Sequence, residues 1–272
     1  MLSGDGAEER EAAVATPRGP ALGVQSVSKS FGAVQAVSGV SFDVEPGSFT
    51  CLIGPNGAGK STLLHCIAGF LRHDSGRIVL EGEDVSPWPS HLRARAGLAT
   101  VFQSATPIGG LDVLGNAMVG CHAWTRNGFT AGILKPPGQR REEHAIREAA
   151  REALELVGLA RLAHRSATTL PFGQLRLLAI ARVLAQRPRV LLLDEPVAGL
   201  CAGEKARLRE VFLDLKKRGF TQILVEHDMQ FVGAVADRVL VLDRGRLIAD
   251  GPPQQIRHDE QVIAAYLGTA TV

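Results

Sequence analysis

The chain of 272 residues lacks any apolar run that approaches the roughly 18 residues a membrane-spanning helix needs. Its acidic start lacks a basic region followed by an apolar one, so we expect no signal peptide. The four cysteines are scattered and form no C-x-x-C pair, which argues against a zinc site or a disulfide framework and suits a reducing cytosol. Any role at a membrane is therefore expected to be peripheral, through a partner.

An excess of charge is also missing, because the net charge is only +2. A dedicated nucleic-acid binder would be more basic, so we expect no nucleic-acid partner. The length allows one large α/β domain or two lobes that share a core, and no internal repeat divides it. Residues 1–20 are rich in Ala, Glu, Gly and Pro and are expected to form a disordered tail.

A glycine-rich motif of the form G-x-x-x-x-G-K-[ST] is the strongest local signal. It comprises Gly54, Pro55, Asn56, Gly57, Ala58, Gly59, Lys60, Ser61 and Thr62. The apolar residues 49–53 before it predict a strand, and apolar residues at helical spacing follow it. In such a P-loop, backbone N–H groups and a helix N-terminus surround phosphate oxygens. We predict nucleoside triphosphate binding, with Lys60 at the β- and γ-phosphates and the Ser61 hydroxyl on Mg²⁺.

A second signal is an apolar run at 190–193 that ends in Asp194 and Glu195. The run predicts a strand buried on both faces. An Asp at its end can hold Mg²⁺ through the water shell, and the adjacent Glu can orient or deprotonate an attacking water. The strand predicted at 222–225 leads to His227, which we expect to reach a γ-phosphate at the carboxyl edge of the same sheet.

The remaining pattern predicts strands at both ends of the chain and helices in the middle. Alternating apolar residues between 21 and 44 predict strands, the first ending at Phe31, which can stack on a nucleotide base. The strand at 98–102 ends at Gln103. Further elements are expected as strands at 77–80, 239–242 and 246–248 and as helices at 91–96, 111–119, 141–162, 176–186, 204–218 and 229–236.

Together these motifs resemble the ATP-binding cassette (ABC) family over residues 21–268. The family's elements fall in order on Phe31 (base stacking), Gly54 to Thr62 (P-loop), Gln103 (glutamine loop), Leu170-Pro171-Phe172-Gly173-Gln174 (signature), Asp194-Glu195 (acidic pair) and His227 (switch histidine). The resemblance implies an α/β fold of the P-loop NTPase type. Its parts are a RecA-like core, an N-terminal antiparallel β subdomain and an inserted α-helical subdomain.

The resemblance also implies boundaries and ligands. The ATP-binding domain is expected at 21–251, with the helical subdomain at about 104–186 and a C-terminal helical tail at 252–272. ATP and Mg²⁺ are the implied cofactors. Ser61, Gln103 and Asp194 are the implied metal ligands, and Glu195, His227 and Lys60 the implied catalytic residues.

In this family two cassettes pack head to tail, and each ATP lies between one P-loop and the other subunit's signature. Phe172, Gly173 and Gln174 are therefore expected to face ATP bound to a second ATPase subunit, in a homodimer or a heterodimer. The further implied partners are membrane permease subunits near the glutamine loop and, indirectly, a substrate-binding protein. The resemblance places the chain at the cytoplasmic face of the inner or plasma membrane.

The chain departs from the family pattern at the signature and after the acidic pair. The usual signature serine is Pro171, which has no hydroxyl and no N–H to offer a phosphate. The usual aspartate after the acidic pair is Cys201. These changes favour weak ATPase activity or pairing with a more regular cassette.

A narrower resemblance points to branched-chain amino acid importer ATPases, through residues 128–136, 226–229 and 256–268. Urea- or amide-importer ATPases and lipopolysaccharide-export ATPases share part of this pattern. Two readings of another kind stay open: a regulatory ABC subunit that hardly hydrolyses, and a non-transport ABC protein acting on ribosomes or DNA. Non-transport members usually have paired cassettes or a long coiled-coil insertion, and this chain has neither.

Overall fold

The computed structural model describes residues 19–102, 106–123 and 137–267. Most of the expected tail, the segment at 128–136 and Gln103 lie outside the described residues.

The N-terminal part forms an antiparallel sheet in the order β2-β1-β4-β5. Its strands are β1 (Leu22–Phe31), β2 (Val34–Val44), β4 (Ser75–Leu80) and β5 (Glu83–Asp84). Apolar residues alternate along β2 and turn one face of the sheet inward. The short edge strand β5 pairs antiparallel with the end of β4, where the sequence indicates only a turn.

The second sheet has six strands in the order β10-β9-β3-β8-β7-β6. They are β3 (Phe49–Ile53), β6 (Leu98–Val101), β7 (Val190–Asp194), β8 (Thr221–Val225), β9 (Arg238–Asp243) and β10 (Arg246–Gly251). The pairs from β9 to β6 are parallel, and β10 is antiparallel to β9. Every residue of β3, β7 and β8 is buried, as expected for strands covered on both faces.

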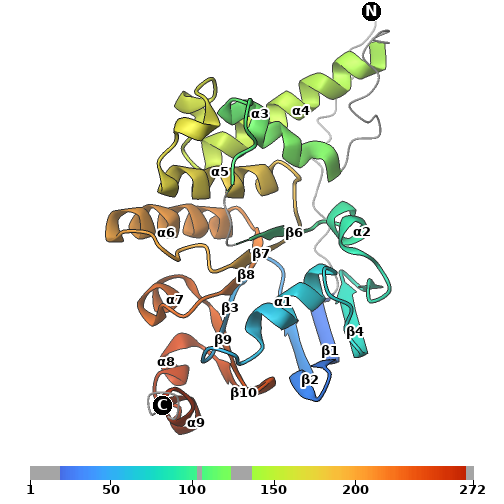
Figure 1. Cartoon of the computed structure of the whole chain (residues 1–272), viewed down its shortest axis with the longest axis vertical. Coiled ribbons are helices and arrows are strands. Elements are labelled where there is room, and N and C mark those ends of the chain that lie inside the picture. Colours follow the sequence, from blue (N-terminus) through green and yellow to red (C-terminus); the bar gives the residue numbers. More distant parts are fainter. Residues whose placement is uncertain (1–18, 103–105, 124–136, 268–272) are drawn as a thin grey trace, which may run out of the picture.

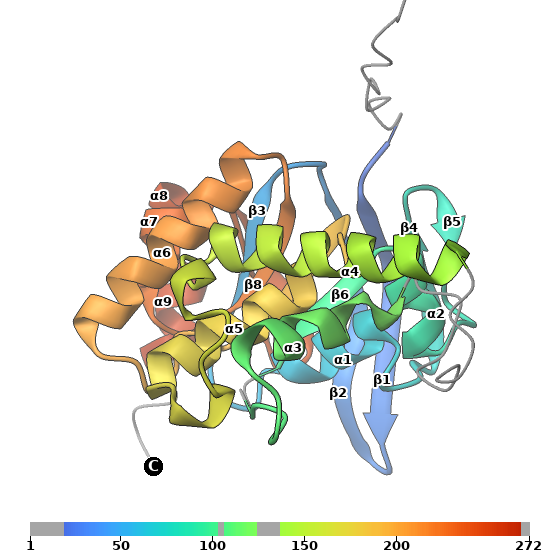
Figure 2. The same ribbon diagram turned by 90° about the horizontal axis from the view of Figure 1, so that it is seen from above.

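The helices fall into groups around this sheet (Figures 1 and 2). They are α1 (Lys60–Ala68), α2 (Ser90–Arg95), α3 (Val113–Met118), α4 (Pro137–Leu156), α5 (Phe172–Leu184), α6 (Ala202–Lys217), α7 (Met229–Val235), α8 (Pro253–Ile256) and α9 (Glu260–Leu267). Figure 1 shows α3, α4 and α5 gathered at the end of the molecule away from the β1–β2 hairpin. The helices α8 and α9 pack against β10.

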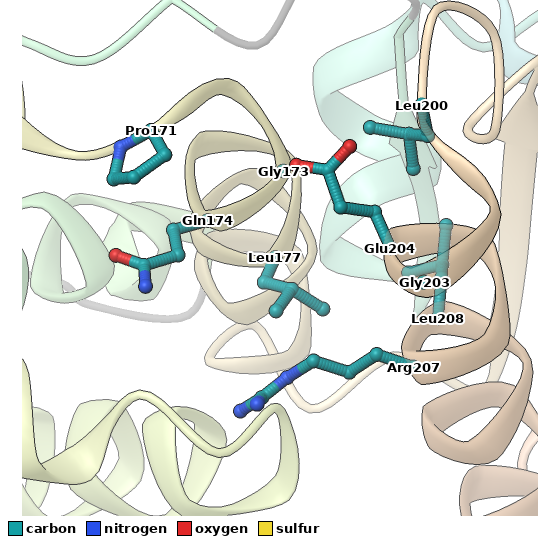
Figure 3. A pocket seen from close by; sticks show the side chains of 9 residues that line it. All are labelled: Pro171, Gly173, Gln174, Leu177, Leu200, Gly203, Glu204, Arg207 and Leu208. Atoms are coloured by element: carbon teal, nitrogen blue, oxygen red, sulfur yellow. The ribbon is translucent and has the colours of Figure 1, made fainter.

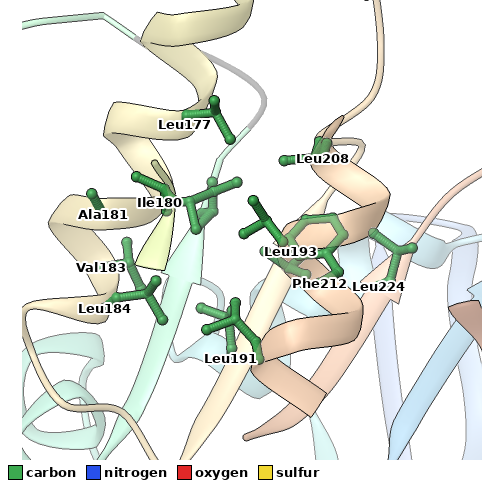
Figure 4. Close-up of a cluster of buried hydrophobic side chains, with 14 of the residues drawn as sticks. Leu177, Ile180, Ala181, Val183, Leu184, Leu191, Leu193, Leu208, Phe212 and Leu224 are labelled. Carbon is green, nitrogen blue, oxygen red and sulfur yellow. The ribbon is translucent and has the colours of Figure 1, made fainter. Parts of the chain in front are cut away.

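Two cores share the six-stranded sheet. On one face α1 is sandwiched between the sheets, with Leu63, Leu64 and Ile67 packed among residues of both. The other face packs under α5, α6 and α7, where Leu193 and Phe212 lie together (Figure 4). Cys51 and Cys66 beside the P-loop are fully buried, so they pack as small apolar residues.

Two helices begin four residues earlier than predicted, whereas the bounds of the other predicted helices differ by at most two residues. The helix expected at 141–162 is α4 (Pro137–Leu156), and Gly158 then takes a left-handed φ of 72° that turns the chain. The helix expected at 176–186 is α5 (Phe172–Leu184). Gly173 is a poor helix former, so the helical pattern in the sequence starts only after it. In the structure the signature residues nevertheless form the first turn of α5.

Arg93 is a buried residue that the sequence did not single out. Its guanidinium donates to the carbonyls of Cys66 and Ile67 at 2.7 Å, both in the last turn of α1. Further bonds reach the carbonyls of Trp88 and Ser86. Arg93 thus satisfies carbonyl groups that the end of α1 would leave unpaired, and it holds the C-terminal end of the helix that follows the P-loop.

Candidate active site

Three adjacent parallel strands deliver the site to one edge of the sheet. β3 leads into the P-loop, β8 leads to His227, and β7 ends at Asp194. Asp194 pairs with Val225 in register, and Leu52 pairs with the same residue from the other side. The expectation that His227 follows a strand beside that of Asp194 is confirmed.

The P-loop backbone requires glycine at its two ends. Gly54 has a φ of 148°, and a Cβ there would lie 2.0 Å from the carbonyl oxygen of Leu242. Gly59 has a φ of 99°, and a Cβ there would lie 2.2 Å from the carbonyl oxygen of Ala36. Both approaches are shorter than any side chain tolerates, so neighbouring strands clamp the loop.

Lys60 is the first residue of α1 and is only 7% exposed. Its Nζ donates to the carbonyls of Gly54 at 2.8 Å and Pro55 at 2.9 Å. Burial lowers the pKa of Lys60, while Glu195 and Asp194 raise it. Among the described residues no side chain caps the helix at Gly59, so its first N–H groups can meet an anion. This arrangement of N–H groups and a buried lysine suits a phosphate group.

The surroundings of Asp194 and Ser61 show whether these residues could hold a magnesium ion. Burial raises the pKa of Asp194; His65 lowers it, Glu195 raises it again, and Lys60 and a Ser61 hydrogen bond lower it. The Asp194 Oδ1 is buried and has no hydrogen-bond partner among the described residues. A buried carboxylate oxygen beside a hydroxyl fits Mg²⁺.

The same residues do not form an all-protein cage. In residues 19–102, 106–123 and 137–267, no three His, Cys, Asp or Glu side chains gather as metal ligands. An ion at Asp194 would therefore depend on water and phosphate oxygens, as Mg²⁺ usually does.

Glu195 and His227 lie on the loops that follow β7 and β8. Glu195 has an unusual φ of 45°, and its N–H donates to the carbonyl of Val225 at 3.0 Å. Its Oε1 lies 3.9 Å from Nδ1 of His227. Both side chains reach solvent, at 27% for Glu195 and 59% for His227. The carboxylate can accept a proton from water, and the imidazole can contact a phosphate beside it.

Glu226 is a residue of this site that sequence reasoning missed. It is fully buried, and its carboxylate accepts the backbone N–H groups of Val197 at 3.2 Å and His227 at 3.1 Å. Burial raises the pKa of Glu226, and these two bonds lower it. The available signal was an acidic residue directly after the apolar residues 223–225 of a predicted strand.

The signature lies at the start of α5. Pro171 is its N-cap residue, Phe172 is 49% exposed, and the Arg176 guanidinium carbon lies 5.1 Å from the Phe172 ring centroid. Gly173 and Gln174 line a pocket of about 310 Å³ between α5 and α6. No P-loop residue lines that pocket in the part of the chain described (Figure 3).

Glu204 of α6 holds the signature from the other side of this pocket. Its Oε2 accepts the N–H of Cys201 at 3.0 Å. Hydrogen bonds from Cys201 lower the pKa of Glu204, and one from the Gly173 N–H adds to them. A Cβ on Gly173 would lie 2.2 Å from Glu204 Oε1, so only glycine allows this contact. Sequence reasoning missed Glu204 too, although it stands three residues after Cys201, the N-cap residue of α6.

The two outlying predicted residues are placed differently. Phe31 ends β1 and is 52% exposed, and the following strand β2 carries Ala36 against Gly59. Gln103 lies outside the described residues. The residue before it, Phe102, packs edge-on against Phe70 at a centroid distance of 4.9 Å.

Comparison with known proteins agrees with this geometry. The model of the ABC transporter family matches residues 37–198, and a model described as branched-chain amino acid ATP-binding cassette transporter matches 246–271. The high-affinity branched-chain amino acid transport ATP-binding protein BraF of Pseudomonas aeruginosa is 41% identical over 92% of this chain and 99% of its own. The corresponding LivG of Escherichia coli is 38% identical over the same shares.

A solved structure gives the same architecture. The crystal structure of the ADP conformation of an ATP-binding cassette of an ABC transporter superposes with a TM-score of 0.80 and 31% identity, covering 92% of this chain and 99% of that one. Across residues 19–102, 106–123 and 137–267, no helix combines the length and apolar character that crossing a bilayer would take.

Proposed function

The chain belongs to the ABC transporter ATP-binding family, and from that premise we propose that it energises an importer of branched-chain or other amino acids. As a member it binds nucleotide and is an ATPase. The observation that supports the substrate class is the C-terminal segment, since residues 246–271 match a model specific to branched-chain amino acid cassettes. The cassette itself never contacts the transported molecule.

The proposed reaction converts ATP and water to ADP and phosphate. The P-loop N–H groups and Lys60 hold the β- and γ-phosphates, Glu195 accepts the proton of the attacking water, and His227 contacts the γ-phosphate. Ser61 and Asp194 would hold Mg²⁺, with Gln103 as a further ligand, and the ion supplies positive charge to the phosphate oxygens. Phe31 would stack on the base.

The second half of each site would come from another subunit. Pro171 and Phe172 are exposed at the N-terminus of α5, and Gly173 and Gln174 follow them in its first turn, so a nucleotide held by another subunit could approach this helix end. We propose a head-to-tail dimer with ATP between one P-loop and the opposite signature. ATP binding closes the dimer, and hydrolysis releases it.

The permease is proposed to dock beside Gln103. Phe70 and Phe102 are 53% and 37% exposed and form an aromatic pair there. Exposed aromatic pairs are typical anchors at protein interfaces. Docking there places the cassette peripherally, at the cytoplasmic face of the inner or plasma membrane, with a substrate-binding protein acting through the permease.

The test is uptake of labelled leucine, with ATPase measured in parallel, by the cassette reconstituted with its co-purified permease and binding protein. Lys60→Ala should abolish both activities because it removes the phosphate charge clamp. Lys217→Ala, an exposed lysine on α6, should change neither.

The outcomes separate the readings. Unchanged ATPase in Lys60→Ala contradicts the proposed site. ATPase stimulated by urea or an amide instead of leucine would point to that importer class. Wild-type protein that binds ATP but hardly hydrolyses it with the permease would indicate a regulatory subunit, which Pro171 and Cys201 favour.

A further inference from the structure

We propose that Glu226 is a positioning residue that ties the His227 turn to the loop following Glu195. The inference rests on the proposed function, since it deepens the role given to His227. It concerns a side chain that would touch neither nucleotide nor water.

The carboxylate divides its two oxygens between two loops. Oε1 accepts the N–H of Val197, three residues after β7 ends, and Oε2 accepts the N–H of His227. The N–H of Asp228 lies 3.5 Å from the same Oε2. The backbone N–H of Glu226 itself donates to the carbonyl of Leu52 in β3. One residue therefore joins the ends of β3, β7 and β8.

Core packing does not account for an acid here. Glu226 follows the apolar residues Ile223, Leu224 and Val225, and its own side chain is fully buried. A buried carboxylate is costly unless hydrogen bonds compensate it. An apolar residue would fill the volume without that cost, so the bonds to two loops are what the carboxylate specifically contributes.

The geometry shows why His227 needs such a tie. Its ring is 59% exposed, so packing does little to fix it. Nδ1 lies 3.9 Å from Glu195 Oε1 and 3.8 Å from Glu226 Oε2. Because Glu226 holds the His227 backbone and the Val197 backbone together, a shift in the loop after Glu195 shifts the histidine with it. The spacing of base and phosphate sensor is thereby kept constant.

Glu226→Gln tests this with almost no change in volume. The amide has one acceptor oxygen, so its NH₂ group must face one of the two N–H donors. We expect kcat for ATP to fall about tenfold, the equivalent of one hydrogen bond to a charged group. KM should change less than about twofold, because the P-loop contacts are untouched. Glu226→Asp keeps the charge and should recover part of kcat.

Gln222→Met is the matched control. Gln222 is also fully buried, lies four residues earlier in the same chain segment, and donates from Nε2 to the carbonyl of Phe212 at 3.1 Å. Loss of this hydrogen bond in Gln222→Met should lower Tm as much as Glu226→Gln does, and it should leave kcat unchanged. A fall in kcat that merely follows Tm across both variants would overturn the proposal.

The double variant with His227→Ala shows whether Glu226 acts through the histidine. In that background Glu226→Gln should cost less than about twofold in kcat, since coupled residues are not additive. An equal loss in both backgrounds contradicts the tie. His227→Ala with wild-type kcat would instead refute the proposed role of His227.

Hydrogen exchange gives a readout that needs no turnover. The amides of Val197 and His227 should exchange faster in Glu226→Gln than in wild type or Gln222→Met. Unchanged protection at both amides sinks the positioning role, whatever the chain's ATPase turns out to be.

Discussion

The P-loop and the signature are both helix N-termini for which we propose phosphate binding, yet they are built in opposite ways. The P-loop is clamped by neighbouring backbone at Gly54 and Gly59, and its Lys60 is buried. At the signature, Pro171 and Phe172 are exposed, and the nearest anion is the chain's own Glu204. Under the proposed function, one chain supplies a complete phosphate-binding loop and a second site that needs nucleotide from another subunit.

Because one half is clamped within the chain and the other is exposed, substitutions in the two halves should have different effects. Damage to the P-loop acts on nucleotide binding within one chain, so it should appear in the monomer. Damage to the signature acts on closure over nucleotide held elsewhere, so it should depend on dimer formation.

The largest effect is expected from Glu195→Gln, which removes the proposed base and keeps the P-loop. Hydrolysis should slow by about 100-fold or more, the contribution of a positioned general base. ATP should still bind and accumulate a dimer, visible by size-exclusion chromatography with light scattering. A monomer with normal turnover would contradict both the base and the two-halved site.

Gly59→Ala should come next, because its Cβ would meet the carbonyl oxygen of Ala36. We expect at least about tenfold weaker ATP binding in the monomer, from overpacking of a clamped loop. Gly57→Ala is the control: its φ is also positive at 79°, but open space surrounds it. Strain alone should cost about fivefold. Equal losses by titration calorimetry would show that the clamp is immaterial.

The elements around the P-loop could be predicted from the sequence almost completely. The bounds predicted for β3 agree with the structure, because the motif fixes the chain on both sides of it. Prediction from the sequence failed where tertiary contacts decide. The start of α5 was placed four residues late, because Gly173 weakens the helical pattern and its contact with Glu204 comes from a distant segment. The roles of Glu226 and Glu204 depend on N–H donors from distant segments, which no spacing reveals.

Pro171→Ser should strengthen the contact of the signature with nucleotide bound to a second subunit. It restores a hydroxyl at the N-cap of α5, where it can bond a helix N–H or the partner's γ-phosphate. We expect ATPase or ATP-driven dimerisation to rise about two- to fivefold. Pro89→Ser, which changes the proline N-cap of α2, should leave both unchanged. If neither quantity moves in Pro171→Ser, the missing hydroxyl has no consequence.

Cys201 gives the smallest and most direct test, because it reports dimer closure without turnover. It is the exposed member of the four cysteines. Burial raises the pKa of Cys66 and of Cys121 to about 11 and that of Cys51 well above its ordinary value, so those thiols should stay unreactive near neutral pH. One thiol per chain should therefore react with a disulfide reagent. Since Cys201 touches Glu204 beside Gly173, closure of a second subunit should shield it.

ATP with Mg²⁺ should slow that labelling severalfold in Glu195→Gln, which holds the closed dimer, and leave it unchanged in Lys60→Ala. The contrast matters because Lys60 lies in the P-loop and the thiol lies beside the signature. If ATP protects Cys201 from labelling only when Lys60 is present, then nucleotide bound at one chain's P-loop covers the signature of the other chain. If ATP does not slow the labelling in any variant, Cys201 lies outside the closed interface. The loop that carries this thiol would then take no part in the contact between the signature and the second subunit.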